Sequence, residues 1–166
     1  LTMVTGRADW PPTPLGTGIA DQLGAYNIVY GLLSALYYRE KTGKGQKIEV
    51  NLFQSLITHQ LQEFVFVLNA GRNFERPRSG IGHPGIGAPF GIYRTADGYI
   101  CISVNPISVL AEILGDEGLN EYDDPQVLFD KRDEVYERIQ KSLLHQPTAY
   151  WIEKMLEKDL WVSEVK

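Results

Sequence analysis

Residues 17–50 read TGIADQLGAYNIVYGLLSALYYREKTGKGQKIEV. Their apolar side chains recur at the spacing of a mostly buried α-helix, at Ile19, Leu23, Ile28, Leu32, Ala35 and Leu36. We expect this helix to cover about residues 19–40 and to stop at Gly43, because glycine commonly ends helices. Lys41 and Lys44 lie where the helix dipole favours cations. The following residues, 47–50, alternate polar and apolar and predict a short strand.

The flanking sequence predicts further elements on both sides. Residues 1–16 carry three prolines and two glycines and are expected to be irregular. Asn51 is expected to cap a second helix over about residues 52–69, which ends near Gly71. Downstream, residues 90–94 and 99–104 form a predicted hairpin, because Asp-Gly between β-prone runs is a strong turn signal.

The rest of the chain is predicted to be helical, with Thr148 as the N-cap of the last helix. These helices are expected at about residues 107–115, 130–145 and 148–158. We therefore expect a mostly helical α+β chain, in which two apolar helices precede a small domain with a β-hairpin and amphipathic helices. The composition changes near residue 70, so the predicted division is 1–70 and 71–166.

Bulk composition excludes several classes of function. The 166 residues are 43% hydrophobic and 22% charged, with a net charge of -5, so we expect neither nucleic acid nor an anionic membrane as a partner. The single cysteine, Cys101, permits no internal disulfide and is consistent with a cytoplasmic protein. The most apolar segments are shorter than a membrane span. The chain begins at Leu1 without a signal peptide, and we expect it to be a fragment.

A glycine-rich loop is predicted over residues 71–91. Its residues 80–85 read GIGHPG and match GxGxxG letter for letter. A dinucleotide site would need a preceding strand and a helix that opens at the glycines, and neither is predicted here. Two interpretations stay open: a flexible surface loop, or a mobile lid whose backbone approaches a ligand. His59, His83 and His145 are scattered singly, so no metal site is expected.

Asp21 is the only acid between Asp9 and Glu40. It falls at the start of the long apolar helix, with Gly18 and Gly24 close in sequence. One interpretation is an ordinary first-turn acid that satisfies helix amides. The other is catalytic, because a helix start favours the ionised carboxylate, which is a nucleophile, and small neighbours leave room for a substrate carbonyl.

The order of these motifs resembles that of the family III CoA-transferases, which include formyl-CoA transferase, carnitine CoA-transferase and 2-methylacyl-CoA racemase. The resemblance rests on Thr17–Asp21, on residues 31–50, and on residues 89–103, which read PFGIYRTADGYICIS. It covers nearly the whole chain and implies the tail of a large α/β domain, a linker and a small domain. The family chain is much longer, and its N-terminal half holds most of the CoA contacts.

In that family the aspartate that matches Asp21 attacks an acyl-CoA thioester. The resemblance implies a mixed anhydride, then an aspartyl-CoA thioester, and transfer of CoA to a second carboxylic acid. Coenzyme A is then a substrate, and no resident cofactor is implied. The glycine loop, with Gly80, Gly82, Gly85 and Gly87, would shield the intermediates from water. Leu52 matches a hydrophobic contact with adenosine, and the family forms interlocked homodimers.

Two other functions stay open. Racemase members carry a glutamate shortly after the strand that matches residues 99–104, whereas this sequence has Asn105, and an amide cannot serve as a general base at neutral pH. This difference favours transfer over racemisation. The other alternative is a non-catalytic piece that binds a partner through its apolar helices. The chain alone is expected to be inactive, and the acyl donor and acceptor acid are not specified.

Overall fold

The computed structural model describes residues 1–166, which form two compact units. The first contains Leu1–Thr2 and Pro14–Asn73, and the second contains Met3–Thr13 and Phe74–Lys166. The N-terminal segment belongs to the second unit because the Arg76 guanidinium donates to carbonyl oxygens of Thr5 and Pro11, at 3.0 and 3.1 Å. Each unit is described separately below.

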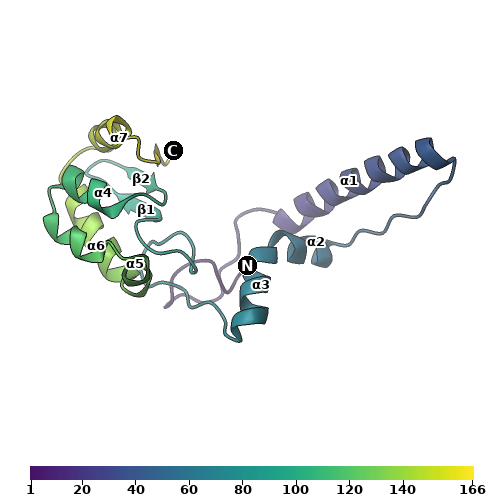
Figure 1. Cartoon of the computed structure of the whole chain (residues 1–166), viewed down its shortest axis with the longest axis horizontal. Helices are drawn as coiled ribbons and strands as arrows, with labels where there is room; N and C mark the ends of the chain where they lie inside the picture. The colour runs from purple at the N-terminus through teal and green to yellow at the C-terminus, as the bar shows by residue number, and fades with distance from the viewer. The chain divides into compact units, whose positions relative to one another are not determined.

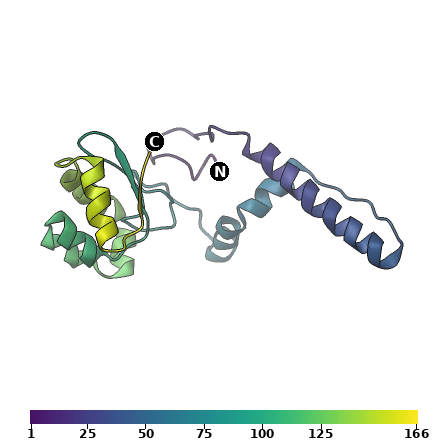
Figure 2. The same ribbon diagram turned by 90° about the horizontal axis from the view of Figure 1, so that it is seen from above.

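The first unit is built from three helices, coloured purple to teal in Figures 1 and 2. Helix α1 spans Ile19–Thr42 and ends at Gly43, whose φ of 73° is left-handed. Residues 43–51 run back along α1, and α2 (Leu52–His59) and α3 (Leu61–Ala70) follow. Asn51 caps α2 by accepting from the Gln54 N–H at 2.8 Å. None of these helices is both long and apolar enough to cross a membrane.

Two glycines on α1 let the returning chain pack closely against it. A Cβ atom at Gly24 would lie 2.5 Å from a methyl carbon of Leu52, and one at Gly31 would lie 2.8 Å from Ile48. Residues seven apart share a helix face, so Gly24 and Gly31 form one strip along α1. We call these two residues the glycine strip. It explains why this helix carries glycines although glycine weakens helices.

The second unit contains a three-stranded antiparallel sheet in the order β1-β2-β3. Its strands are β1 (Gly91–Arg94), β2 (Tyr99–Ile102) and β3 (Val162–Glu164). In the register Tyr93 pairs with Ile100, and both are fully buried, whereas the neighbouring Ile92 is exposed. One face of the sheet therefore belongs to the core.

The remaining elements of the second unit are helical and supply the rest of its core (Figure 1). They are α4 (Ile107–Leu114), the 3₁₀ helix η1 (Glu117–Tyr122), α5 (Pro125–Asp130), α6 (Arg132–Leu143) and α7 (Thr148–Glu157). The largest fully buried side chains come from the sheet and from these helices, and include Tyr93, Ile100, Ile107, Leu110, Leu119, Ile139, Leu143 and Met155. This is the mostly helical α+β architecture that the sequence predicts.

Three local predictions are wrong. Residues 47–50 form no strand, because the sheet consists only of β1, β2 and β3 and none of them pairs with this segment. The predicted helix 52–69 is two helices that meet at Gln60. Thr148 is the first residue of α7 and not its N-cap; its N–H donates to the Asp97 carboxylate of the hairpin turn at 2.8 Å. The sequence interpretation also missed η1, α5 and β3.

The first unit buries very little apolar surface of its own. All of the buried apolar side chains lie in the second unit, whereas Leu33, Phe53 and Leu68 in the first are 60%, 73% and 78% exposed. Each such side chain forgoes on the order of 1.5–3 kcal/mol of burial energy. Helices with apolar side chains on most faces need a covering partner.

We therefore expect the purified 166-residue chain to self-associate and to be inactive. Light scattering should give a mass above that of the monomer, and polar replacement of Leu33 and Phe53 together should shift the mass toward the monomer. Calorimetry should detect no CoA binding. A stable monomer that binds CoA with micromolar affinity and turns over would contradict this expectation.

Candidate functional site

The structure places Asp21 in the first turn of α1, where its side chain is exposed to solvent. Gly18 is the N-cap residue and provides no side-chain cap. A Cβ atom on Gly18 would lie 3.2 Å from Asp21 Oδ2, so the glycine leaves the carboxylate oxygen uncovered. The position combines an accessible carboxylate with the positive end of a helix dipole.

Leu52 of α2 packs against Gly24, which lies one helical turn from Asp21 on α1. Gly24 is one turn after Asp21, and residues three apart are neighbours on a helix surface. The Leu52 side chain packs over Gly24 and stays 47% exposed. Both residues are site candidates from the sequence, and the fold brings them to the same region of the first unit.

A separate groove of about 330 Å³ lies between α1 and α2. Its lining consists of Leu23, Tyr26, Asn27, Tyr30, Ser55, Thr58 and His59. Asp21 is absent from this lining, so the groove is distinct from the surface around the carboxylate. The buried Ser55 hydroxyl donates to the Asn51 carbonyl oxygen at 2.9 Å and has a structural partner.

Residues 74–91 of the predicted glycine loop lie in the second unit, and the segment 80–91 is attached to the sheet at both ends. Ile81 and Gly91 form an isolated β-bridge, and the Ile92 N–H donates to the Gly80 carbonyl oxygen at 3.2 Å. The Gly82 N–H donates to the Phe90 carbonyl oxygen at 2.9 Å. No helix opens at these glycines, because residues 81–90 precede a strand. The local structure therefore lacks the strand–helix context of a dinucleotide fold.

The four candidate glycines differ in what surrounds them. A Cβ atom at Gly80 would collide with the Tyr136 hydroxyl and lie 2.9 Å from the Ile92 carbonyl oxygen, and one at Gly87 would lie 3.0 Å from the Leu128 carbonyl oxygen. At Gly82 and Gly85 a Cβ atom would meet only side chains, chiefly those of Phe90 and Phe74. Gly82 and Gly85 are also the exposed members. Gly80 and Gly87 thus have packing roles, while Gly82 and Gly85 occupy the accessible part of the loop.

Asn105 is buried and uses its amide to hold the chain that enters β3. Its Oδ1 accepts from the Trp161 N–H at 2.9 Å, and its Nδ2 donates to the carbonyl oxygens of Ser103 and Trp161 at 3.2 and 3.1 Å. The amide is therefore fully occupied by backbone groups. A carboxylate at this position would lack the two donors that Asn105 supplies.

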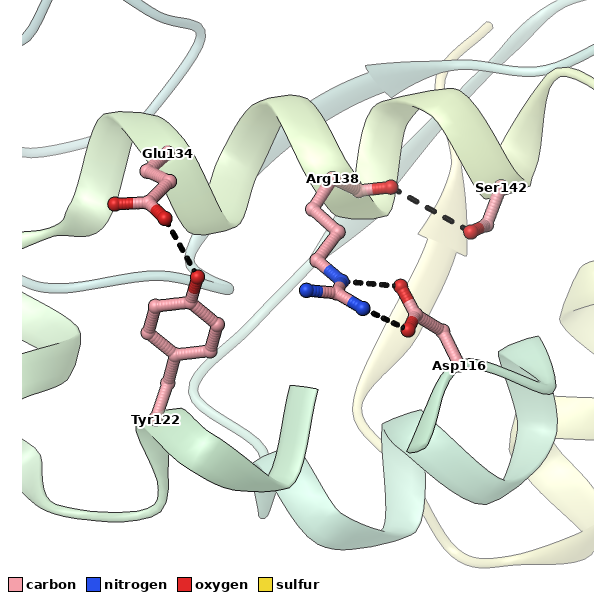
Figure 3. A network of polar contacts seen from close by, with 5 residues as sticks. All are labelled: Asp116, Tyr122, Glu134, Arg138 and Ser142. Carbon is pink, nitrogen blue, oxygen red and sulfur yellow. Dashed lines mark hydrogen bonds and ion pairs between the residues drawn. The ribbon is translucent and has the colours of Figure 1, made fainter. Parts of the chain in front are cut away.

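A polar network joins η1 to α6 (Figure 3). The Arg138 guanidinium forms a two-pronged ion pair with Asp116, and the Tyr122 hydroxyl donates to Glu134 at 2.7 Å. Hydrogen bonds from Arg138 hold the pKa of Asp116 below its usual range. These side chains line a hollow of about 620 Å³. Because each charged or polar group of this network has a hydrogen-bond partner, we interpret the network as a structural link between η1 and α6.

Sequence reasoning missed the residues that position the glycine loop, above all Asp133 and Tyr136 on α6. Asp133 accepts hydrogen bonds from backbone N–H groups of Arg78 and Ser79, and the Tyr136 hydroxyl donates to Ile92 O at 2.5 Å. Both residues look like ordinary first-turn and stripe positions of an amphipathic helix. The only local signal was weak: an acid in the first turn of an amphipathic helix.

The fold is shared with solved structures of a known family. A family protein from Brucella suis, described as CAIB/BAIF, superposes with a TM-score of 0.78 at 22% identity over 99% of this chain and 44% of that one. A protein of Mycobacterium tuberculosis superposes with a TM-score of 0.76 at 19% identity, over 94% of this chain and 42% of that one. At these identities the likeness establishes the fold.

The family itself is established by sequence. The model of CoA-transferase family III matches residues 1–166, and the chain belongs to this family. It is 30% identical to the acetyl-CoA:oxalate CoA-transferase of Acetobacter aceti over 92% of this chain and 40% of that protein. It is 31% identical to the formyl-CoA:oxalate CoA-transferase of Streptomyces coelicolor over 74% of this chain and 33% of that protein. The chain thus spans 40% or less of these two relatives.

We predict that Asp116→Asn lowers the unfolding free energy by about 1 kcal/mol at neutral pH, because it removes a charge-assisted pair. The native pKa of Asp116 is lowered, so its contribution is present above the usual carboxyl pKa and disappears as the pH falls through the native value. Urea unfolding should therefore show the difference at pH 7 and lose it progressively as the pH falls below the usual carboxyl pKa and through the lowered native value.

The matched control is Glu112→Gln, which breaks the exposed ion pair with Lys158. Exposed pairs contribute little, so a loss below about 0.5 kcal/mol is expected. The prediction would be contradicted if both variants lost the same unfolding free energy, or if the loss in Asp116→Asn persisted in acid. Either result would show that the ion pair between Asp116 and Arg138 contributes no more than an exposed pair.

Proposed function

We propose that the whole protein transfers coenzyme A from an acyl-CoA donor to a carboxylic acid acceptor, with Asp21 as the covalent catalyst. Membership of CoA-transferase family III supports the reaction class. The observation that carries the assignment of the residue is an exposed carboxylate in the first turn of α1, beside Gly18 and one turn from the Gly24–Leu52 contact.

The proposed reaction consists of acyl exchanges at one carboxylate. An Asp21 oxygen attacks the thioester carbonyl and the C–S bond breaks, so that CoA leaves as the thiolate and a mixed anhydride of Asp21 and the donor acid remains. The thiolate then attacks the aspartyl carbonyl, which releases the donor acid and forms an aspartyl-CoA thioester. The acceptor carboxylate repeats the two steps in reverse, so that the new acyl-CoA leaves and the Asp21 carboxylate is regenerated. Covalent catalysis divides one difficult exchange into easier steps.

Leu52 is proposed to contact the adenosine side of CoA. Its side chain is half exposed at the first residue of α2, and Gly24 holds it close to α1. An apolar side chain in that position offers a surface for an aromatic base, and it packs against Gly24, which lies one helical turn from Asp21.

Transfer is favoured over racemisation by the environment of Asn105. Proton abstraction next to a thioester carbonyl needs a base, and an amide that is occupied by three backbone hydrogen bonds does not provide one. The relatives reported above are named as CoA-transferases with oxalate in their names. We propose a small carboxylic acid as the acceptor, and a homodimer as the assembly that covers the apolar helices.

We expect Asp21→Asn in the full-length protein to lower the rate of transfer by several orders of magnitude, because the amide keeps the shape but is no anionic nucleophile. Glu40→Gln makes the same chemical change at the far end of α1 and should leave the rate unaltered. Mass spectrometry of the trapped enzyme should place the CoA adduct on Asp21. Transfer that survives in Asp21→Asn, or an adduct on another residue, would exclude this assignment.

We further propose that residues 80–87 form a lid over the intermediates. Bulky residues at Gly82 or Gly85 should lower transfer and raise thioester hydrolysis, because the aromatic neighbours prevent the loop from closing. Gly45→Ala is the control, since a Cβ atom there meets nothing within 4 Å. Labelled acyl-CoA reports both products in one assay. An unchanged ratio of hydrolysis to transfer would rule out a lid.

A further inference from the structure

The polar network that joins η1 to α6 (Figure 3) occupies only part of the hollow that it lines. This hollow measures about 620 Å³ and lies wholly within the second unit. Further lining comes from the end of α6, with Lys141, Ser142 and His145, and from the end of α4, with Leu114 and Gly115. We call Lys141, Ser142 and His145 the basic end of the hollow.

Two side chains of the basic end have hydrogen-bonding capacity that no residue of the chain uses. Neither the Lys141 ammonium nor the His145 imidazole forms a hydrogen bond or an ion pair. Glu137 lies four residues before Lys141, a spacing at which opposite charges often pair on a helix, yet no ion pair joins them. Asp116 is not available either, because Arg138 Nε and Nη2 bind both of its carboxylate oxygens.

Lys141 and His145 lie on the same side of the chain. Lys141 is in the last turn of α6, and Leu144, just after the helix, keeps helical backbone angles with φ −67° and ψ −14°. Residues four apart are neighbours on such a backbone. Hydrogen bonds from Arg138 are the main cause of the lowered pKa of Asp116, and the charge of Lys141 adds to this effect. The Lys141 ammonium is therefore within electrostatic reach of the ion pair that lines the hollow.

The wall beside the basic end is held in place and leaves space in front of it. The Arg138 guanidinium lies close against Gly118, where a Cβ atom would be 2.7 Å from Cζ and 2.9 Å from Nη1. A Cβ atom at Gly115, in contrast, would meet nothing within 4 Å. Arg138 thus stays paired with Asp116, and the positive charge of Lys141 has no counter-ion within the chain.

The helix dipole explains only part of this arrangement. Cations in the last turn of a helix are stabilised by the macrodipole, and Lys141 occupies such a position. That role requires no hollow and leaves the donor groups of both side chains bound to water. The same dipole opposes an anion at this place, so we expect any anion to bind with an affinity on the order of millimolar.

We propose that the basic end of this hollow binds a small oxyanion, a carboxylate or a phosphate group, between Lys141 and His145. The ammonium supplies a charge-assisted hydrogen bond, and the imidazole supplies an N–H donor. The Ser142 hydroxyl lines the same end and donates at 3.5 Å to the Arg138 carbonyl oxygen, a long bond that an anion can replace. The site lies in the second unit alone and is independent of Asp21 and of the proposed transfer reaction.

The test is calorimetric titration of the full-length protein, saturated with CoA, with inorganic phosphate and separately with succinate. Lys141→Gln and His145→Gln should each weaken binding of the preferred probe by about tenfold, as the loss of a charge-assisted hydrogen bond predicts. Lys141→Arg keeps the charge and should bind like the wild type. The matched control is Lys154→Gln, which removes the same charge from α7, where the ammonium pairs with Glu157 outside the hollow. It should leave the affinity unchanged.

Hydrogen exchange localises the site, because the bound probe should slow exchange in the segments 114–118 and 138–146. The probe that binds more tightly identifies the group as a phosphate or a carboxylate. The proposal is overturned if neither probe binds saturably, if protection appears only in other segments, or if Lys154→Gln weakens binding as much as Lys141→Gln. If Lys141→Gln and His145→Gln keep the wild-type affinity, the two cations serve only the helix end. Should His145→Gln not fold, the contrast between Lys141→Arg and Lys141→Gln decides.

Discussion

The hydrogen bond from the Tyr136 hydroxyl to the Ile92 carbonyl oxygen connects the helices, the sheet and the glycine loop of the second unit. Tyr136 belongs to α6, Ile92 to β1, and Ile92 in turn pairs with Gly80 of the loop. The Tyr136 ring stacks on the buried Tyr93 ring with 4.3 Å between centroids, a contact that contributes about 0.5–1.5 kcal/mol beyond burial. Burial raises the pKa of both hydroxyls, so each stays protonated and remains a donor.

The first unit depends on a different constraint, the absence of side chains at Gly24 and Gly31. A single methyl group at either position would meet Leu52 or Ile48 within 3 Å. The two glycines lower the helix propensity of α1, but they allow the following chain at Ile48 and Leu52 to pack closely against it. Asp21 lies one turn from this contact. The positions of the candidate nucleophile and of Leu52 are therefore products of the same packing requirement.

Much of the local structure follows from short-range signals. The ends of α1 and α3 are set by Gly43 and Gly71 with left-handed backbone, and the hairpin forms around Asp97-Gly98. The errors have a common origin, because they occur where distant residues decide the outcome. Residues 47–50 have a strand pattern but no strand beside them. The segment 162–164 becomes a strand only because β2 offers it an open edge.

The sequence by itself determined the family, the helical and hairpin segments, and the choice of Asp21 and the glycines as candidates, because these depend on residue order and local backbone preference. Tertiary structure alone decided which glycines pack and which stay exposed, and that Asp133 and Tyr136 hold the loop. The tertiary structure also showed that the side-chain amide of Asn105 forms its hydrogen bonds with backbone groups. Hydrogen bonds between residues more than fifty positions apart leave no trace in local sequence, since either partner looks ordinary until the chain has folded.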